Sequence, residues 1–253
     1  MKVKSFFLPH AVVATVAQGR TILRGAWSVF RANAWFAFAI FIGAIGVGLL
    51  IWPHDRQLLE TIHWWCRADP TSARCVAAFL GTWGDYHTYN VPMAVAIWLY
   101  GVATKSSAWR RAAVIYFLGA TLAGLFDDCF RLTLGRPRPD AHVPDGFYGL
   151  THGFSQKFES FPSGHAAADF GAALALLMVK RPLGFLALLF AFAVAWGRME
   201  LNRHYPSDVA VGSIIGLYFG LLVGFGAGRQ TQPIQLHASS GVTSGKHDLR
   251  RES

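Results

Sequence analysis

The stretch FPSGHAAADFGAALALLMV (161–179) places a short polar turn directly before an apolar run. Proline is preferred in the first turn of a helix, so Pro162 predicts that a helix begins beside Ser163. A helix needs about 20 residues to cross a bilayer, and the apolar run is close to that length. The stretch therefore predicts a membrane-spanning helix whose first turn carries polar groups.

The rest of the chain repeats this pattern of apolar runs separated by polar connections. Hydrophobic residues make up 53% of the 253 residues, which leaves almost nothing for a separate soluble domain. We predict an all-α fold, a bundle of six transmembrane helices over residues 34–228. The six predicted spans lie near 34–52, 88–104, 110–130, 163–179, 182–197 and 207–228.

Three clusters of polar residues lie where predicted spans meet loops. They read RLTLGRPRP (131–139), FPSGH (161–165) and GRMELNRHYPSD (197–208). Together they contain histidines, a carboxylate and several arginines, which can supply a nucleophile, a proton donor and a cage for an oxyanion. This combination is typical of phosphoryl transfer through a histidine.

The order and spacing of the three clusters resemble the signature of the type 2 phosphatidic acid phosphatase family. That signature reads Lys-x6-Arg-Pro, Pro-Ser-Gly-His and Ser-Arg-x5-His-x3-Asp, and the resemblance covers roughly residues 75–228. It implies a membrane lipid phosphatase, related to the bacterial class A acid phosphatases and the vanadium haloperoxidases. Two positions depart from the signature: Arg131 stands where the family usually has lysine, and Gly197 where it usually has serine.

His204 is the predicted nucleophile. Pro206 suits the first turn of the last span, so His204 lies just before that helix and Asp208 lies within its first turn. A carboxylate there is expected to accept the Nδ1 proton of His204 and to leave Nε2 free to attack. The resemblance implies that His204 forms a phosphohistidine.

His165 is the predicted proton donor, by its position and by the resemblance. A helix that starts at Pro162 points the N–H groups of Ser163, Gly164 and His165 out of its N-terminus, where they favour a bound phosphate. His165 would then lie near the leaving oxygen. Asp169, one helical turn further, is expected either to hold the Nδ1 proton of His165 or to form a structural salt bridge.

The arginines of the clusters form a predicted phosphate cage. Arg131, Arg138 and Arg198 would bind the phosphoryl oxygens through charge-assisted bidentate bonds. Asp127 and Asp128 precede Arg131 by four and three residues on one predicted helix, so we expect them to orient its side chain.

The loop 140–161 is a candidate for gripping the head group of a substrate. Lys157 within it and Arg136 before it are expected only to widen the field that attracts anions. We attribute the formal net charge of +9 to this site and to membrane topology, not to nucleic-acid binding. No metal or other cofactor is predicted, because the histidines lack ligand spacing and have arginines as expected neighbours.

The distribution of lysine and arginine predicts how the bundle is oriented, because positive residues in short loops stay on the cytoplasmic side. They gather in the N-terminal segment, in the connections near 105–111 and 180–181, and after residue 228. We therefore predict that both termini are cytoplasmic. The active site then lies at the extracytoplasmic surface of a bacterial-type inner (plasma) membrane.

Outside the six spans we expect a cytoplasmic N-terminal segment (1–33) and a disordered cytoplasmic tail (229–253). Residues 18–33 carry arginines on one helical face and apolar residues on the other, which fits either a helix in the membrane surface or a helix packed on the bundle. Cys66 and Cys75 share the first extracytoplasmic loop. They are expected either to pair, which would contribute about 2.5–3 kcal/mol, or to remain thiols.

These expectations combine into one prediction of function. The resemblance implies an enzyme that hydrolyses the terminal phosphate of a lipid phosphate monoester or lipid pyrophosphate, without metal. Candidate substrates are undecaprenyl pyrophosphate, phosphatidic acid, phosphatidylglycerol phosphate and the lipid A phosphates. Two alternatives stay open: a phosphotransferase that passes the group to a second lipid, and an anion or lipid transporter whose arginines only bind.

Overall fold

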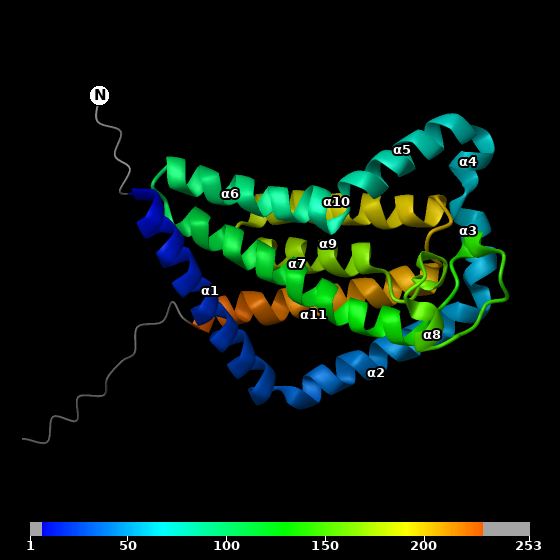
Figure 1. The fold of residues 1–253 in the computed structure, drawn as a ribbon, viewed down its shortest axis with the longest axis horizontal. Helices are drawn as coiled ribbons and strands as arrows, with labels where there is room; N and C mark the ends of the chain where they lie inside the picture. Colours follow the sequence, from blue (N-terminus) through cyan, green and yellow to red (C-terminus); the bar gives the residue numbers. More distant parts are fainter. Residues whose placement is uncertain (1–6, 230–253) are drawn as a thin grey trace, which may run out of the picture.

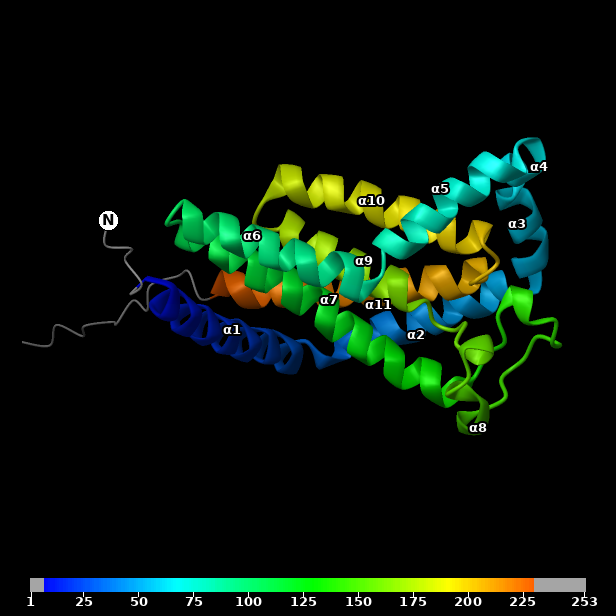
Figure 2. The same ribbon diagram turned by 45° about the horizontal axis from the view of Figure 1, so that its top comes forward.

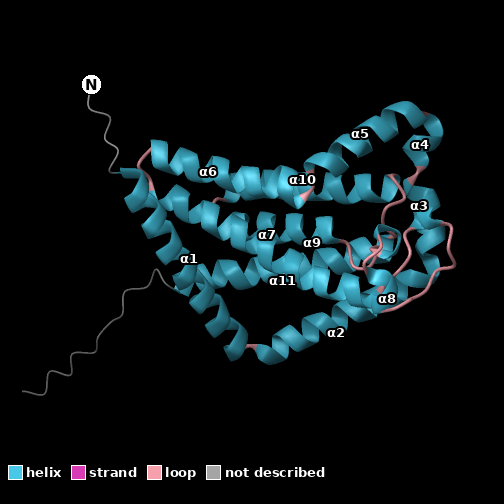
Figure 3. Ribbon diagram, in the orientation of Figure 1, coloured by secondary structure: helices cyan, strands magenta, loops and turns pink. Residues whose placement is uncertain are grey.

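The computed structural model describes residues 7–229 of the chain. Helices joined by short loops make up almost all of this part, and Figure 3 shows no strand in it. One isolated bridge pairs Arg136 with Glu159, in the loops between two long helices. The predicted all-α fold is therefore confirmed.

Each of the six predicted spans coincides with a helix. Four segments are long and apolar enough to cross a membrane, namely Ala34–Ile62, Ser107–Leu134, Arg181–Glu200 and Pro206–Gly228. The other two helices are shorter than predicted, because a π-helical turn, η2 (Tyr86–Asn90), precedes α6 and because α9 ends at Leu177. The six helices are α2 (Ala34–Ile51), α6 (Val91–Ala103), α7 (Ser107–Leu134), α9 (Gly164–Leu177), α10 (Arg181–Glu200) and α11 (Pro206–Arg229).

Helix α9 lies at the centre of the bundle, between α7, α10 and α11 (Figures 1 and 2). Its sequence is rich in alanine and glycine, which lets neighbouring backbones come close. A Cβ on Gly119 of α7 would lie 2.6 Å from the carbonyl oxygen of Gly171 of α9, so a larger residue has no room there. Gly197 of α10 is similarly confined, since its Cβ would lie 3.3 Å from the carbonyl oxygen of Ala77.

Helix α1 (Phe7–Ala32) packs along α7 and α11. Ile22 is buried in this contact, and Gly25 faces the backbone of Gly226 so closely that neither position has space for a side chain. The predicted amphipathic segment 18–33 thus packs on the bundle, one of the two arrangements expected for it. Its place relative to the membrane surface stays a prediction.

The three motif clusters lie at one end of the bundle, on the right in Figure 1, where α7 and α10 end and α9 and α11 begin. The basic connections from α6 to α7 and from α9 to α10 lie at the opposite end. This segregation is what the charge argument requires, while the side of the membrane that each end faces stays a prediction. Short helices complete the structure: η1 (Trp52–His54), α3 (Asp55–Ile62), α4 (Trp64–Ala68), α5 (Pro70–Trp83), η3 (Pro139–Ala141), α8 (Leu150–Gly153) and η4 (Gln156–Phe158).

Two further expectations concern the loops and the tail. Cys66 and Cys75 are free thiols, so the structure has the unpaired alternative. Each is held in a helix of its own, Cys66 in α4 and Cys75 in α5. The prediction of a disordered tail concerns residues 230–253, which lie outside the described part of the chain.

Candidate active site

The ends of four long helices bring the three clusters together. Helix α7 is followed by Gly135, whose φ of +61° is a left-handed conformation that glycine adopts without strain. The turn directs the chain back across the bundle end, where the N–H of Arg138 donates to the carbonyl oxygen of Lys157 at 2.8 Å. The N–H of Ser163 donates to the carbonyl oxygen of Asp208 at 3.1 Å, which joins the starts of α9 and α11.

His204 is buried between these helix ends, with 1% of its surface exposed. Its Nδ1 lies 2.8 Å from the carbonyl oxygen of Ser160 and 4.0 Å from Oδ2 of Asp208. A carbonyl oxygen only accepts, so Nδ1 carries the proton and Nε2 keeps a free lone pair. The tautomer is the predicted one, but the Nδ1–H donates to the carbonyl oxygen of Ser160 rather than to Asp208, which corrects the expected direct bond.

The surroundings of His204 keep its ring neutral. Burial, and then the positive charges of Arg198 and Arg138, lower the pKa of His204 well below its usual 6.5. A neutral ring is required for attack on phosphorus, because the charged ring has no free lone pair. The predicted nucleophile and two of the predicted cage arginines therefore act on each other electrostatically.

Asp208 supports His204 indirectly, through hydrogen bonds to neighbouring residues. Its Oδ2 accepts from Oγ of Ser160 at 2.6 Å and from the backbone N–H of Tyr205 at 2.7 Å. Ser160 also supplies the carbonyl oxygen that bonds to His204. Because the carboxylate is occupied in this way, Asp208 orients the ring through Ser160.

Arg136 is fully buried beside Asp208. This corrects the expectation that Arg136 only widens the positive electrostatic field that attracts anions. Its guanidinium pairs with Asp208, with Asp55 at 2.8 Å and with Asp145 at 2.8 Å. Burial alone would lower the pKa of Arg136, but hydrogen bonds with Asp145 and Asp55 and the charge of Asp208 raise it. Three carboxylates from separate parts of the chain thus converge on one arginine, and no local sequence pattern indicates this.

His165 is the second residue of α9, and its ring turns toward the end of α5. Its Nε2 donates to the carbonyl oxygen of Gly81 at 3.2 Å and lies 4.0 Å from Oδ2 of Asp85. Asp169, one turn further along α9, instead accepts from Nδ2 of Asn90 at 2.6 Å. This corrects both expectations for Asp169: it bonds to an amide rather than to His165 or a cation, and Asp85 is the carboxylate beside His165.

Arg131 reaches the first turn of α9. Its Nη1 lies 3.4 Å from the place that a Cβ would take on Gly164, so the glycine leaves room for the guanidinium. Nη2 of Arg131 pairs with Asp128 at 2.5 Å. Asp127 is buried, and within residues 7–229 neither of its oxygens has a hydrogen-bond partner. Asp128 rather than Asp127 therefore orients Arg131.

Glu159 lies beside the cage arginines, although it belongs to none of the three motif clusters. Its Oε2 lies 3.9 Å from Nη1 of Arg131 and 3.8 Å from Nη2 of Arg138. One carboxylate oxygen thus faces two of the cage arginines, in a position that an oxygen of a bound phosphate could occupy instead. Burial and the charge of Arg203 lower the pKa of Arg138 to about 10, so this arginine remains charged at neutral pH.

Ser163 and Lys157 lie at the site but act through backbone groups. The N–H of Ser163 is taken by Asp208, so the open donors of the α9 N-terminus begin at Gly164. Lys157 is exposed, and its carbonyl oxygen, which accepts from Arg138, is the group that contacts the cage. The helix start still suits an anion.

A cavity of about 220 Å³ opens onto this site beside α7. Arg131, Gly164 and His165 line it, as the clusters predict. Asp85 and His87 line it too, although they belong to no motif cluster. The segment before α6 therefore contributes side chains to the cavity that sequence reasoning missed.

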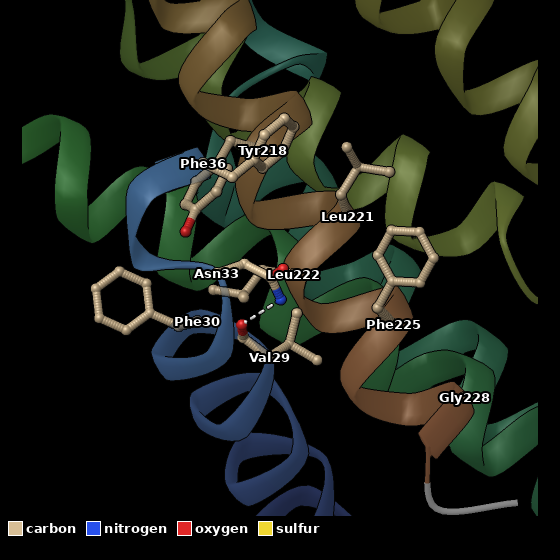
Figure 4. A pocket seen from close by; sticks show the side chains of 9 residues that line it. All are labelled: Val29, Phe30, Asn33, Phe36, Tyr218, Leu221, Leu222, Phe225 and Gly228. Atoms are coloured by element: carbon tan, nitrogen blue, oxygen red, sulfur yellow. Dashed lines mark hydrogen bonds between the residues drawn. The ribbon is translucent and has the colours of Figure 1, made fainter. Parts of the chain in front are cut away.

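A larger groove, of about 770 Å³, lies between α1 and α11 (Figure 4). Figure 4 shows mostly apolar side chains around it, with Asn33 bonded to the carbonyl oxygen of Val29 at 2.9 Å. On α11 its lining runs from Tyr218 to Gly228, whereas Asp208 lies in the first turn of that helix. The groove is thus separate from the motif residues.

A family model and several known proteins are similar to this chain in sequence. A family model described as the PAP2 superfamily matches residues 112–226. A lipid A 4'-phosphatase of Bacteroides thetaiotaomicron is 35% identical over 155 residues, which are 57% of this chain and 67% of that protein. A lipid A 1-phosphatase of Rhizobium etli is 37% identical over 168 residues, 60% of this chain and 71% of that protein. An undecaprenyl-diphosphatase of Bacillus subtilis is 27% identical over 128 residues, 51% of this chain and 62% of that protein.

Proposed function

Because the chain belongs to the PAP2 superfamily, we propose that it is a membrane phosphatase that removes the terminal phosphate of a lipid phosphate monoester or lipid diphosphate. The observation that carries the proposal is the state of His204: its ring is buried and neutral, and its Nε2 is unprotonated and lies near the positive charges of Arg138 and Arg198. Preorganised positive charge around a nucleophile stabilises the charge that develops on a transferring phosphoryl group. The named relatives act on lipid A or on undecaprenyl diphosphate.

The proposed reaction has two steps. Nε2 of His204 attacks phosphorus, and the bond to the lipid oxygen breaks as that oxygen takes a proton from His165. Water then attacks the phosphohistidine and gives a proton to His165, and inorganic phosphate leaves. Arg131, Arg138 and Arg198, with the N-terminus of α9, neutralise the charge on the phosphoryl group in both steps.

The position of the site at one end of the bundle favours an amphiphilic substrate, whose hydrocarbon chain stays in the bilayer while its phosphate reaches the cage. We place this end on the extracytoplasmic side, because basic connections occupy the other end.

Cysteine labelling tests that orientation. In a protein whose native cysteines are replaced, Thr151→Cys near the site is expected to react with an impermeant reagent in intact cells. Ser107→Cys at the opposite end is expected to react only after permeabilisation. The reverse pattern would place the site in the cytoplasm.

A screen of purified protein tests the function and its alternatives. Release of inorganic phosphate from one pure lipid, among phosphatidic acid, lipid A and undecaprenyl diphosphate, is the expected result. A phosphotransferase would instead release the phosphoryl group only to an added second lipid. A transporter would bind the same lipids without turnover, in the wild type as well as in His204→Ala.

Vanadate is expected to inhibit, and excess EDTA to leave the activity intact. Vanadate adopts trigonal-bipyramidal geometry and can bond to Nε2 of His204, where it would imitate the transferring group. The arginines and the helix N-terminus supply the charge that metal ions provide in many phosphatases. Phosphate release measured with each additive checks this, and loss of activity in EDTA that magnesium restores would contradict it.

Arg131→Lys is expected to keep turnover within about tenfold of wild type, whereas Arg131→Ala loses about 10²–10³-fold. Lysine keeps the positive charge beside Gly164 and the pairing with Asp128, although it lacks the planar fork. The measurement is kcat for phosphate release. Equal losses in the two variants would mean that the fork itself, rather than the charge, is required.

A further inference from the structure

We propose that Asp85 is a positioning residue for His165. The carboxylate of Asp85 favours the protonated imidazole of His165, the form that can donate a proton to the leaving oxygen. This inference rests on the proposed function. Asp85 lies outside residues 112–226, the part that the family model matches, and in none of the three clusters. Only the folded chain places it against the site.

Two contacts determine where this carboxylate points. Oδ1 accepts the backbone N–H of His87 at 2.9 Å, so Asp85 caps the turn η2. Oδ2 is thereby left on the side of His165, 4.0 Å from its Nε2. Asp85 also lines the cavity of about 220 Å³, together with Arg131 and His165. The carboxylate is therefore held by the backbone and directed at the imidazole.

The hydrogen bond of His165 to Gly81 explains why a nearby carboxylate is needed for proton donation. Its Nε2 donates to the carbonyl oxygen of Gly81 at 3.2 Å, so in the neutral ring Nδ1 carries no proton. Nδ1 can give a proton to a leaving oxygen only when the ring is positively charged. The proposed reaction thus requires the imidazolium form of His165.

Most groups that face His165 oppose this positive charge. Arg198 from α10 and Arg131 from α7 carry positive charges that act against it, and the ring of His204, from the loop before α11, is neutral. A carboxylate at 4.0 Å favours the charged ring instead. The carboxylates of α7 are less available, because Asp128 is paired with Arg131 and Asp127 lies against Gly164. Asp85 is therefore the carboxylate placed to offset the arginines.

The dependence on the leaving group tests this role. Decyl phosphate has a poor leaving group that needs a proton, whereas decylphenyl phosphate has the same chain on a phenol that leaves readily. With full-length protein in detergent, Asp85→Asn is expected to lower kcat for decyl phosphate by about tenfold or more, with KM unchanged. For decylphenyl phosphate the loss is expected to stay below about threefold, since general-acid catalysis contributes less there.

The variants are chosen so that a structural effect can be recognised. Asparagine keeps the acceptor that caps η2 and removes only the charge. Asp69→Asn is the matched control, because Asp69 is exposed and caps α5 in the same way, accepting from the N–H of Ser72 at 3.1 Å. Asp85→Glu should restore part of the lost rate, and the alkaline limb of the pH–rate profile should move to lower pH in Asp85→Asn.

A double variant connects the effect to the imidazole. In a His165→Ala background, Asp85→Asn is expected to cause no further loss on decyl phosphate, because the two residues act as one unit. Equal losses on both substrates, no loss on decyl phosphate, or a full additional loss in the double variant would each overturn the proposal for Asp85. A wild-type protein that hydrolyses neither phosphate, or a His204→Ala variant with wild-type rates, would instead overturn the proposed function.

Discussion

Replacement of His204 by alanine is expected to lower the rate of phosphate release by about 10⁴-fold or more, the scale seen when a nucleophile is removed from a catalytic unit. The reason is the unprotonated Nε2: the carbonyl oxygen of Ser160 accepts a hydrogen bond from Nδ1–H and so keeps the proton on Nδ1. No neighbouring group in the described site has the same position, because Asp208 is held by Arg136, Ser160 and Tyr205.

The measurement is kcat with a lipid phosphate, accompanied by binding of the same substrate. His54→Ala is a suitable control, since His54 is an exposed histidine in η1 that belongs to no part of the proposed site. Retained binding with lost turnover would support a nucleophilic role and argue against a transporter. Wild-type rates in His204→Ala would end the phosphohistidine mechanism.

Arg136→Ala is expected to destabilise the folded protein by about 3–5 kcal/mol, the usual cost of removing one partner of a buried ion pair. Asp55 and Asp208 are almost completely buried, at 2% and 0% exposed, and would be left without their shared cation. The loss of Arg136 would also free Asp208 to move, so we expect activity to fall together with stability.

Unfolding in detergent by denaturant or heat measures this effect. Arg203→Ala is the matched control, because Arg203 pairs with Asp140 at 3.0 Å while both side chains remain more than a third exposed. Exposed pairs contribute roughly 0–1 kcal/mol. Similar destabilisation in the two variants would show that the buried network does not hold the bundle end together.

The amino-acid sequence by itself predicted the six helices of the bundle and the three clusters, whereas α3, α4 and α5 lie in what was predicted as a loop. Apolar runs of about the length of a bilayer mark membrane helices because each helix satisfies its own backbone hydrogen bonds, so the signal is local. The start of α11 was predictable from Pro206, which is its first residue. Helix α9 begins at Gly164, two residues after Pro162, with Ser163 as its N-cap, so its start was predicted only to within about one residue. The neighbours of His204 and His165 along the chain, including Asp208 and Gly164, could likewise be read from motif spacing.

Only the tertiary structure decided which group each carboxylate at the site contacts. Asp208 and Asp169 stand four residues after a histidine, a spacing that suggests direct contact, yet side-chain direction leads them to Ser160 and Asn90. Ser160 takes the place of Asp208 at His204, and Asp85 takes the place of Asp169 beside His165. Asp55, also far along the chain, joins Asp208 at Arg136. Contacts of this kind depend on how helices pack at the bundle end, and hydrophobic periodicity records which residues face inward but not which polar groups meet there.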